Sequence, residues 1–235
     1  MDSTRSGHDE KFLPPSFVLI IGPGVFGLST ARSMARNPTF SSASITLVGR
    51  SPDAGGFRFP DAASVDKSRI IRPDYKDLLY ARLAAQAQVH WRSRSSPSTL
   101  GSEGRYHETG LVLVADTESP NIKYVRESFD NATSLAAAAG NPSTVRELTN
   151  GDAIRKRTGT GGSSGSWGYV NETSGWADAA ASMKWLFTKV RGETRVKPVW
   201  GTVSSLVTTG DRVTCAVLSD GREFDADLVV VAASA

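Results

Sequence analysis

An α/β fold built around a parallel sheet is predicted by three features of this 235-residue chain. Residues 17–21 (FVLII) form a short apolar run, which is typical of a central parallel strand covered on both faces. A glycine-rich turn and a helical pattern follow it directly. Apolar runs return at 45–48 and, near the end of the chain, at 228–231. We therefore place all three runs in one sheet.

The first of these runs opens a βαβ unit. A helix is expected from about Val25 to Ala35, because Asn37-Pro38 is a stop signal. The run at 45–48 supplies the second strand. A long loop is then expected from Arg50 to about Lys76, and loops of this length often serve function.

The middle of the chain departs from this unit. Residues 77–92 are expected to form a helix with one apolar face, made by Leu79, Leu83, Ala87 and Trp91. Further along we expect a strand at 109–116, a helix at 124–139, a short helix capped by Thr149 or Asn150, and a flexible loop at 159–168.

The last third returns to the opening sheet. We expect a helix at 177–190, a strand near 195–199, a hairpin turn at 208–212 with a strand up to Leu218, and the strand at 228–231. The chain stops at Ala235, directly after that strand, and this predicts a C-terminally truncated chain. The expected division is a disordered tail at 1–16, a nucleotide-binding domain at 17–105, part of a second domain at 106–175, and a return to the first domain at 176–235.

Composition and charge exclude several classes of function. A hydrophobic content of 39% and a charged content of 22% are typical of soluble globular proteins. The net charge of +3 is spread along the chain, so we expect no nucleic-acid partner. The N-terminus is polar and no apolar run is long enough for a membrane, so we expect a cytoplasmic or peroxisomal protein that is not secreted and binds no membrane. Cys215 stands alone and three histidines are scattered, so we expect no disulfide framework and no metal site. The oligomeric state stays open.

The glycine turn after the first strand carries the strongest functional signal. Gly22, Gly24 and Gly27 give the pattern G-x-G-x-x-G between a strand and a helix. The first glycine permits a tight turn, the second lets a pyrophosphate approach the backbone, and the third lets helix and strand pack closely. Phosphates then meet free N–H groups at the start of the helix. With a second strand following, the pattern predicts a Rossmann-type dinucleotide-binding domain.

The end of the second strand departs from the usual pattern. An acidic residue normally binds the ribose hydroxyls there, but the sequence has Gly49 followed by Arg50. One interpretation is an NADP site with Arg50 facing a 2′-phosphate. The other is an FAD site with a weakened ribose contact. An acid restored at position 49 is expected to strengthen FAD binding and to weaken NADP binding.

Four segments of the sequence resemble one enzyme family in the family's own order. They are "DAASVDKSRIIRPDY" (Asp61–Tyr75), "LYARLAAQAQVHWR", "WGYVNETSGWADAAASM" (Trp167–Met183) and "FDADLVVVAASA". The family is the FAD-dependent amine oxidases, which include monomeric sarcosine oxidase, saccharopine oxidase and the fructosyl amino acid oxidases, within the D-amino-acid-oxidase-like flavoproteins. The resemblance covers nearly the whole chain from Phe17 onward and favours FAD over NADP.

The resemblance implies both a fold and a function. It implies a Rossmann-type FAD-binding domain interleaved with part of a mixed-sheet substrate domain. It implies an FAD-dependent oxidoreductase that oxidises the C–N bond of a secondary amine or N-substituted amino acid, such as sarcosine, saccharopine or a fructosyl amino acid, with oxygen as acceptor. Its partner would be that small-molecule amine. The alternatives are a truncated, non-catalytic nucleotide-binding remnant and an NADP-dependent reductase. Truncation predicts that this chain alone shows no turnover.

The resemblance also implies roles for individual residues. The residues that would contact the cofactor are Gly22, Gly24, Val25, Phe26 and Gly27 at the pyrophosphate, Arg50 beside the adenosine, Val203 at the adenine, and Ser68, Arg69 and Ile70 near the flavin. Arg72 would bind the substrate carboxylate. Three aromatic residues, Trp167, Tyr169 and Trp176, are expected to pack in the core.

Overall fold

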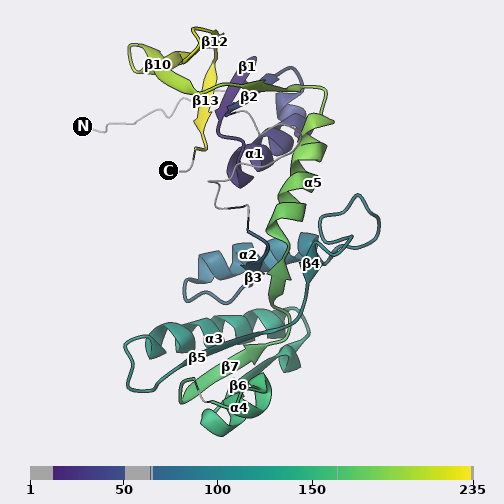
Figure 1. Cartoon of the computed structure of the whole chain (residues 1–235), viewed down its shortest axis with the longest axis vertical. Coiled ribbons are helices and arrows are strands. Elements are labelled where there is room, and N and C mark those ends of the chain that lie inside the picture. The colour runs from purple at the N-terminus through teal and green to yellow at the C-terminus, as the bar shows by residue number, and fades with distance from the viewer. Residues whose placement is uncertain (1–12, 51–63, 65, 163, 234–235) are drawn as a thin grey trace, which may run out of the picture. The chain divides into compact units, whose positions relative to one another are not determined.

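The structure is a computed structural model of the chain and describes residues 13–50, 64, 66–162 and 164–233. It divides into two compact units (Figure 1), one made of residues 1–65 and 183–235 and the other of residues 66–182. These units do not coincide with the expected boundaries after residues 105 and 175, because residues 69–71 pair with 175–177 and the helix after them packs on the middle of the chain. Which part binds cofactor and which binds substrate stays a prediction. The expected tail at 1–16 falls largely outside the described residues.

A four-stranded parallel sheet forms the centre of the first unit. Its strand order is β13 (Leu228–Val231), β1 (Phe17–Ile21), β2 (Ser44–Gly49) and β9 (Val196–Trp200). All three neighbouring pairs run parallel. The predicted return of the last apolar run to the opening sheet is therefore confirmed. It returns at the edge, where Leu228 and Val231 remain exposed.

Both faces of this sheet are covered. Alternation along β1 sends Val18 and Ile20 to one face, where they pack with α1 (Val25–Arg36) and with the part of α5 (Ala179–Arg191) from Met183 onward. Leu19 points to the other face and packs on an antiparallel sheet. That sheet consists of β10 (Val203–Thr209), β11 (Arg212–Leu218) and β12 (Glu223–Asp225). A short 3-10 turn, η1 (Pro38–Phe40), ends α1 at the predicted Asn-Pro signal.

The second unit contains two small antiparallel sheets and three helices. One sheet has the order β3 (Arg69–Ile71), β8 (Gly175–Ala177) and β4 (Tyr106–His107). The other has the order β5 (Leu111–Ala115), β7 (Trp167–Asn171) and β6 (Val145–Leu148). The remaining elements are α2 (Leu78–Arg92), α3 (Ile122–Ala138), η2 (Pro142–Thr144) and α4 (Gly151–Thr158).

Several predictions for this unit are confirmed and two are wrong. Asn150 caps α4, since its side chain accepts a hydrogen bond from the Ala153 amide at 2.9 Å. The predicted loop at 159–168 ends too late, because Trp167 and Gly168 already belong to β7. The apolar face predicted for α2 is also wrong. Leu79, Leu83 and Ala87 are exposed, while Ala81 and Gln88 face inward.

Local packing explains why α2 buries Ala81 and Gln88 instead of the predicted apolar face. Ala81 is small enough for close approach, and the Gln88 amide donates to the Thr173 carbonyl at 3.0 Å, so a polar residue is satisfied inside. Within the described ranges, no helix has both the length and the apolar character needed to cross a membrane.

Candidate functional site

The carboxyl ends of the parallel strands gather the predicted cofactor residues of the first unit. The glycine turn follows β1, Arg50 follows β2, and Gly201 follows β9 and leads into Val203. Because the strands are parallel, these ends share one edge of the sheet. The Gly201 amide donates to the Gly49 carbonyl at 2.8 Å, which ties the start of β10 to the end of β2. This edge is the place where open α/β sheets bind ligands.

Two glycines of the turn are required by the fold itself. Gly22 has a φ of +102°, which favours glycine, and a Cβ there would lie 2.7 Å from the carbonyl oxygen of Ala232 at the end of β13. A Cβ on Gly27 would overlap the carbonyl oxygen of Gly22. The first and third glycines therefore hold strand, helix and neighbouring strand together.

Gly24 is different because its side-chain position is open. It is the N-cap of α1, and a Cβ there would meet no heavy atom of the described residues within 4 Å. Within the same residues no side chain caps the helix, and its first turn carries no acid. Val25 and Phe26 are exposed, Phe26 by 77%. A helix start with a partial positive charge, uncapped amides and an open flank fits a pyrophosphate.

The side-chain position of Gly49, at the end of β2, is occupied by a residue of the glycine turn. A Cβ on Gly49 would overlap Cδ and Cγ of Pro23, the residue between the first two glycines. The ring of Pro23 thus occupies the space that a side chain at position 49 would need. The structure gives no room for the single acidic substitution that was expected to strengthen FAD binding.

The other predicted residues lie in the second unit, on or next to β3. Ser68 and Ile70 are exposed, and the Arg69 guanidinium forms an ion pair with Asp66 at 2.9 Å. Ile70 lies opposite Trp176 in β8. The ring of Trp176 stacks on that of His107, with centroids 4.3 Å apart, so Trp176 is half-buried in a surface stack. Trp167 and Tyr169 pack in the core as predicted.

Arg72 is held in one orientation by three neighbours. Its guanidinium donates to the Asp74 carbonyl at 2.6 Å and to the Tyr124 hydroxyl at 3.2 Å. Its Cζ also lies 4.9 Å from the centre of the Tyr75 ring. The two hydrogen bonds use two of the five donors of the guanidinium. The remaining N–H donors of the Arg72 guanidinium can still bind a carboxylate.

A buried carboxylate next to Arg72 was missed by sequence reasoning. Asp74 is fully buried and accepts hydrogen bonds from Tyr169 Oη at 2.9 Å, Asn171 Nδ2 at 3.1 Å and Ser174 Oγ at 2.6 Å. Burial, followed by the negative charge of Asp74, raises the pKa of Tyr169 well above its usual range, so the phenol stays a donor. The partners lie 95 to 100 residues further along the chain. No local pattern could have identified them.

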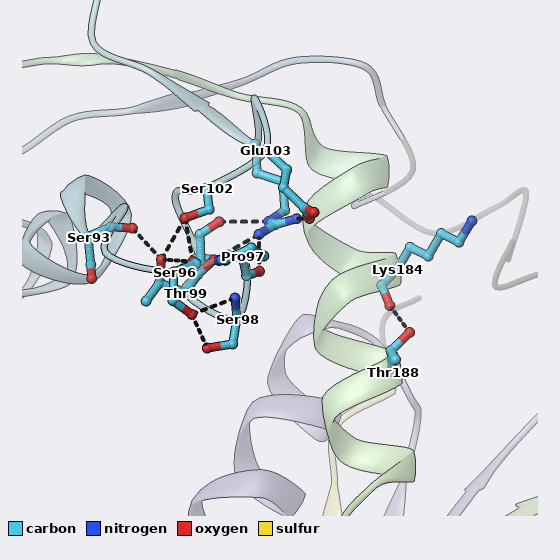
Figure 2. Close-up of polar contacts among 11 residues, drawn as sticks. Ser93, Ser96, Pro97, Ser98, Thr99, Ser102, Glu103, Lys184 and Thr188 are labelled. Atoms are coloured by element: carbon cyan, nitrogen blue, oxygen red, sulfur yellow. Dashed lines mark hydrogen bonds and ion pairs between the residues drawn. The ribbon is translucent and has the colours of Figure 1, made fainter.

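A second feature that sequence reasoning missed is the loop after α2, shown in Figure 2. Arg105 is buried and donates to the carbonyls of Pro97, Thr99 and Leu100 at 2.8–3.0 Å, and it pairs with Glu103 at 2.5 Å. Serine and threonine hydroxyls bridge the same loop. The loop borders a cavity of about 400 Å³, whose lining also includes Arg94, Tyr106 and His107. This cavity lies within the second unit.

The predicted residues thus form two groups, one in each unit. The glycine turn, Arg50 and Val203 belong to the first unit, while Ser68, Arg69, Ile70 and Arg72 belong to the second.

Comparison with known proteins identifies relatives of this chain. Residues 18–235 match the DAO family model, described as FAD dependent oxidoreductase. Amino acid oxidase imqH of Aspergillus flavus is 33% identical over 94% of this chain and 52% of its own length. L-saccharopine oxidase of Schizosaccharomyces pombe is 27% identical over 93% of this chain and 50% of its own length. A modified fructosyl peptide oxidase from Aspergillus nidulans has the same fold, with a TM-score of 0.71 at 21% identity over 94% of this chain and 50% of its own. The chain spans about half the length of the relatives it matches.

Proposed function

This chain belongs to the DAO family of FAD-dependent oxidoreductases, and on this premise we propose that it is the FAD-binding part of an amine oxidase. The reaction would be oxidation of the C–N bond of a secondary amine or an N-substituted amino acid, with oxygen as acceptor. The family match confirms the predicted cofactor, FAD, over NADP. The names of the relatives, an amino acid oxidase and an L-saccharopine oxidase, support an amino acid or amine as substrate.

One observation carries the proposal in the structure itself. The uncapped start of α1 and the open side of Gly24 lie at the carboxyl edge of the parallel sheet. A dinucleotide pyrophosphate needs both features. We propose that residues 22–27 hold this group and that Arg50 and Val203 contact the adenosine.

Bound FAD would supply the redox chemistry, by taking a hydride equivalent from the carbon next to the substrate nitrogen and passing the electrons to oxygen as peroxide. We propose that Ser68, Arg69 and Ile70 contact the flavin. The positive charge of Arg69 would favour the extra negative charge of the reduced flavin. Arg72 would orient the substrate through its carboxylate, since a guanidinium fork matches that group in a bidentate way. We also propose that the protein acts in the cytoplasm or in the peroxisome.

The cofactor part of the proposal is tested by titrating the purified chain with FAD. Binding should quench flavin fluorescence and give a protein fraction with flavin colour after gel filtration. A folded chain that leaves flavin fluorescence unchanged would contradict the proposal.

The substrate part is tested by adding sarcosine, saccharopine or a fructosyl amino acid to the FAD-loaded chain. The flavin spectrum and peroxide formation are followed together. A spectral change with one amine that is lost in Arg72→Gln supports the substrate class. A chain that binds FAD and responds to none of the three amines is the result expected both from truncation and from a non-catalytic nucleotide-binding remnant, so only a response to an amine separates the two.

A further inference from the structure

We propose that Pro23 and Gly49 are a coupled pair that removes the acidic ribose contact from this cofactor site. The inference rests on the proposed FAD site and concerns how the adenosine ribose is recognised. Pro23 lies in the phosphate-binding turn, and Gly49 lies where related sites carry the acid that binds ribose hydroxyls. The side chain missing at position 49 is replaced in space by the ring of Pro23.

The contact is specific to two atoms of the proline ring. A Cβ on residue 49 would overlap Cδ and Cγ of Pro23, whereas it would lie 3.6 Å from Cβ of the same residue, which is ordinary van der Waals distance. An alanine at position 23 keeps only Cβ. It would therefore leave room for a side chain at position 49.

Hydrogen bonds hold both the turn that carries Pro23 and the end of β2 that carries Gly49 in place. The Gly22 amide donates to the Val48 carbonyl at 2.8 Å, which holds the turn against the end of β2. The Gly49 carbonyl accepts from the Gly201 amide at 2.8 Å, which holds β2 from the other side. Val48 itself is fully buried. A side chain at position 49 must therefore break one of these bonds or displace the proline.

With this pair, the site loses the hydrogen bonds of a carboxylate to the ribose and gains a more rigid phosphate-binding turn. Pro23 fixes its own φ near −65° and so limits the conformations of the turn before the cofactor arrives. The acid that would accept hydrogen bonds from the ribose is absent at position 49. The site thus binds FAD with a stiffened turn and no carboxylate at this position.

The test is a double-mutant cycle with Pro23→Ala and Gly49→Asp in the full chain, measured by urea unfolding without cofactor and by FAD titration. Gly49→Asp alone should lower stability and weaken FAD binding. The same substitution in a Pro23→Ala background should leave stability close to that of Pro23→Ala. Gly49→Ala, alone and with Pro23→Ala, is the matched control that adds volume without a charge.

The effect of the negative charge at position 49 on FAD binding is measured by comparing the aspartate with the alanine variant. Pro23→Ala/Gly49→Asp should bind FAD about tenfold or more tightly than Pro23→Ala/Gly49→Ala, since hydrogen bonds to a charged group are worth about that factor. Equal affinities would overturn the ribose assignment. Additive stability effects of the two substitutions would overturn the steric coupling. A parent chain that binds no FAD would contradict the proposed function, while the stability cycle without cofactor would still decide the coupling.

Discussion

The hydroxyl of Tyr169 donates a hydrogen bond to the carboxylate of Asp74 over 2.9 Å, and both side chains are completely buried. Asn171 and Ser174 donate to the same carboxylate. All three side-chain donors are neutral, and the Arg72 guanidinium lies next to the cluster, where it donates to the Asp74 backbone carbonyl at 2.6 Å. The network joins the segment that carries Arg72 to strand β7.

Replacing Asp74 with Asn should destabilise the chain by about 2–4 kcal/mol. One carboxylate oxygen becomes an amide that donates, and it then faces other donors in a buried place. Urea unfolding of the cofactor-free chain measures the effect. Ser174→Ala removes one donor and leaves the acceptor intact, so it should cost less. An Asp74→Asn variant as stable as the parent would show that the network contributes little.

Replacing Gly24 with Val should separate cofactor binding from folding. The position has an extended backbone and no side chain in the way among the described residues, so the stability cost should be limited to about 1 kcal/mol, from replacing a glycine N-cap with valine. FAD affinity should fall by more than about tenfold, because the side chain fills the space proposed for the pyrophosphate.

Gly22→Ala is the contrasting variant for that experiment. Its positive φ and its contact with Ala232 should cost about 1–3 kcal/mol of stability. Unchanged FAD affinity in Gly24→Val would remove the pyrophosphate from this turn.

Replacing Tyr106 with Phe should change the alkaline behaviour of the folded chain. Burial, followed by the charge of Glu108, raises the pKa of Tyr106 from 10.0 to about 12. The neutral phenol is therefore favoured in the folded state. Its contribution to stability is complete below pH 10 and is lost as the pH rises through about 12.

Phenolate absorbance during a pH titration of the folded protein measures this. The difference between the parent and Tyr106→Phe should develop near pH 12 and be absent near pH 10. A difference already complete at pH 10 would show that the folded protein leaves this phenol unprotected.

Replacing Arg105 with Lys should loosen the loop at 93–104. An ammonium group cannot reproduce the fork that reaches three carbonyls and Glu103, so we expect a loss of about 2–3 kcal/mol. Chymotrypsin, which can cleave at Leu100, should cut the variant faster than the parent. Arg94→Lys is the matched control, because Arg94 donates to the Tyr106 carbonyl from the same loop. Equal cleavage of Arg105→Lys and the parent would contradict this role.

The glycine turn and its sheet could be predicted because their signals are local. Three glycines, one apolar run before them and a helical pattern after them all lie within residues 17–36. The contact between Gly27 and Gly22 is local as well, although Gly22 is also constrained by Ala232 at the end of β13. The strand at 228–231 could be placed in the same sheet because an all-apolar run is typical of a parallel strand, although this strand lies at the edge with Leu228 and Val231 exposed.

The second unit was harder to predict because its buried polar residues form hydrogen bonds with partners far away in the sequence. Gln88 looks like a surface residue, yet its partner Thr173 lies 85 positions away and lets it face the core. Asp74 follows a proline in a segment that reads as a loop, and its donors come from β7 and the turn after it. Only Trp167 and Gly168 of β7 fall in the loop predicted at 159–168, because the Gly- and Ser-rich run continues up to them.

The overlap between Pro23 and position 49 also makes the order of substitutions at the two positions matter. With Pro23 present, an acid placed at position 49 enters space that the ring already occupies, so it lowers stability. With a smaller residue at position 23, the same acid meets no such overlap. An acid at position 49 is therefore less costly after the proline has been replaced than before.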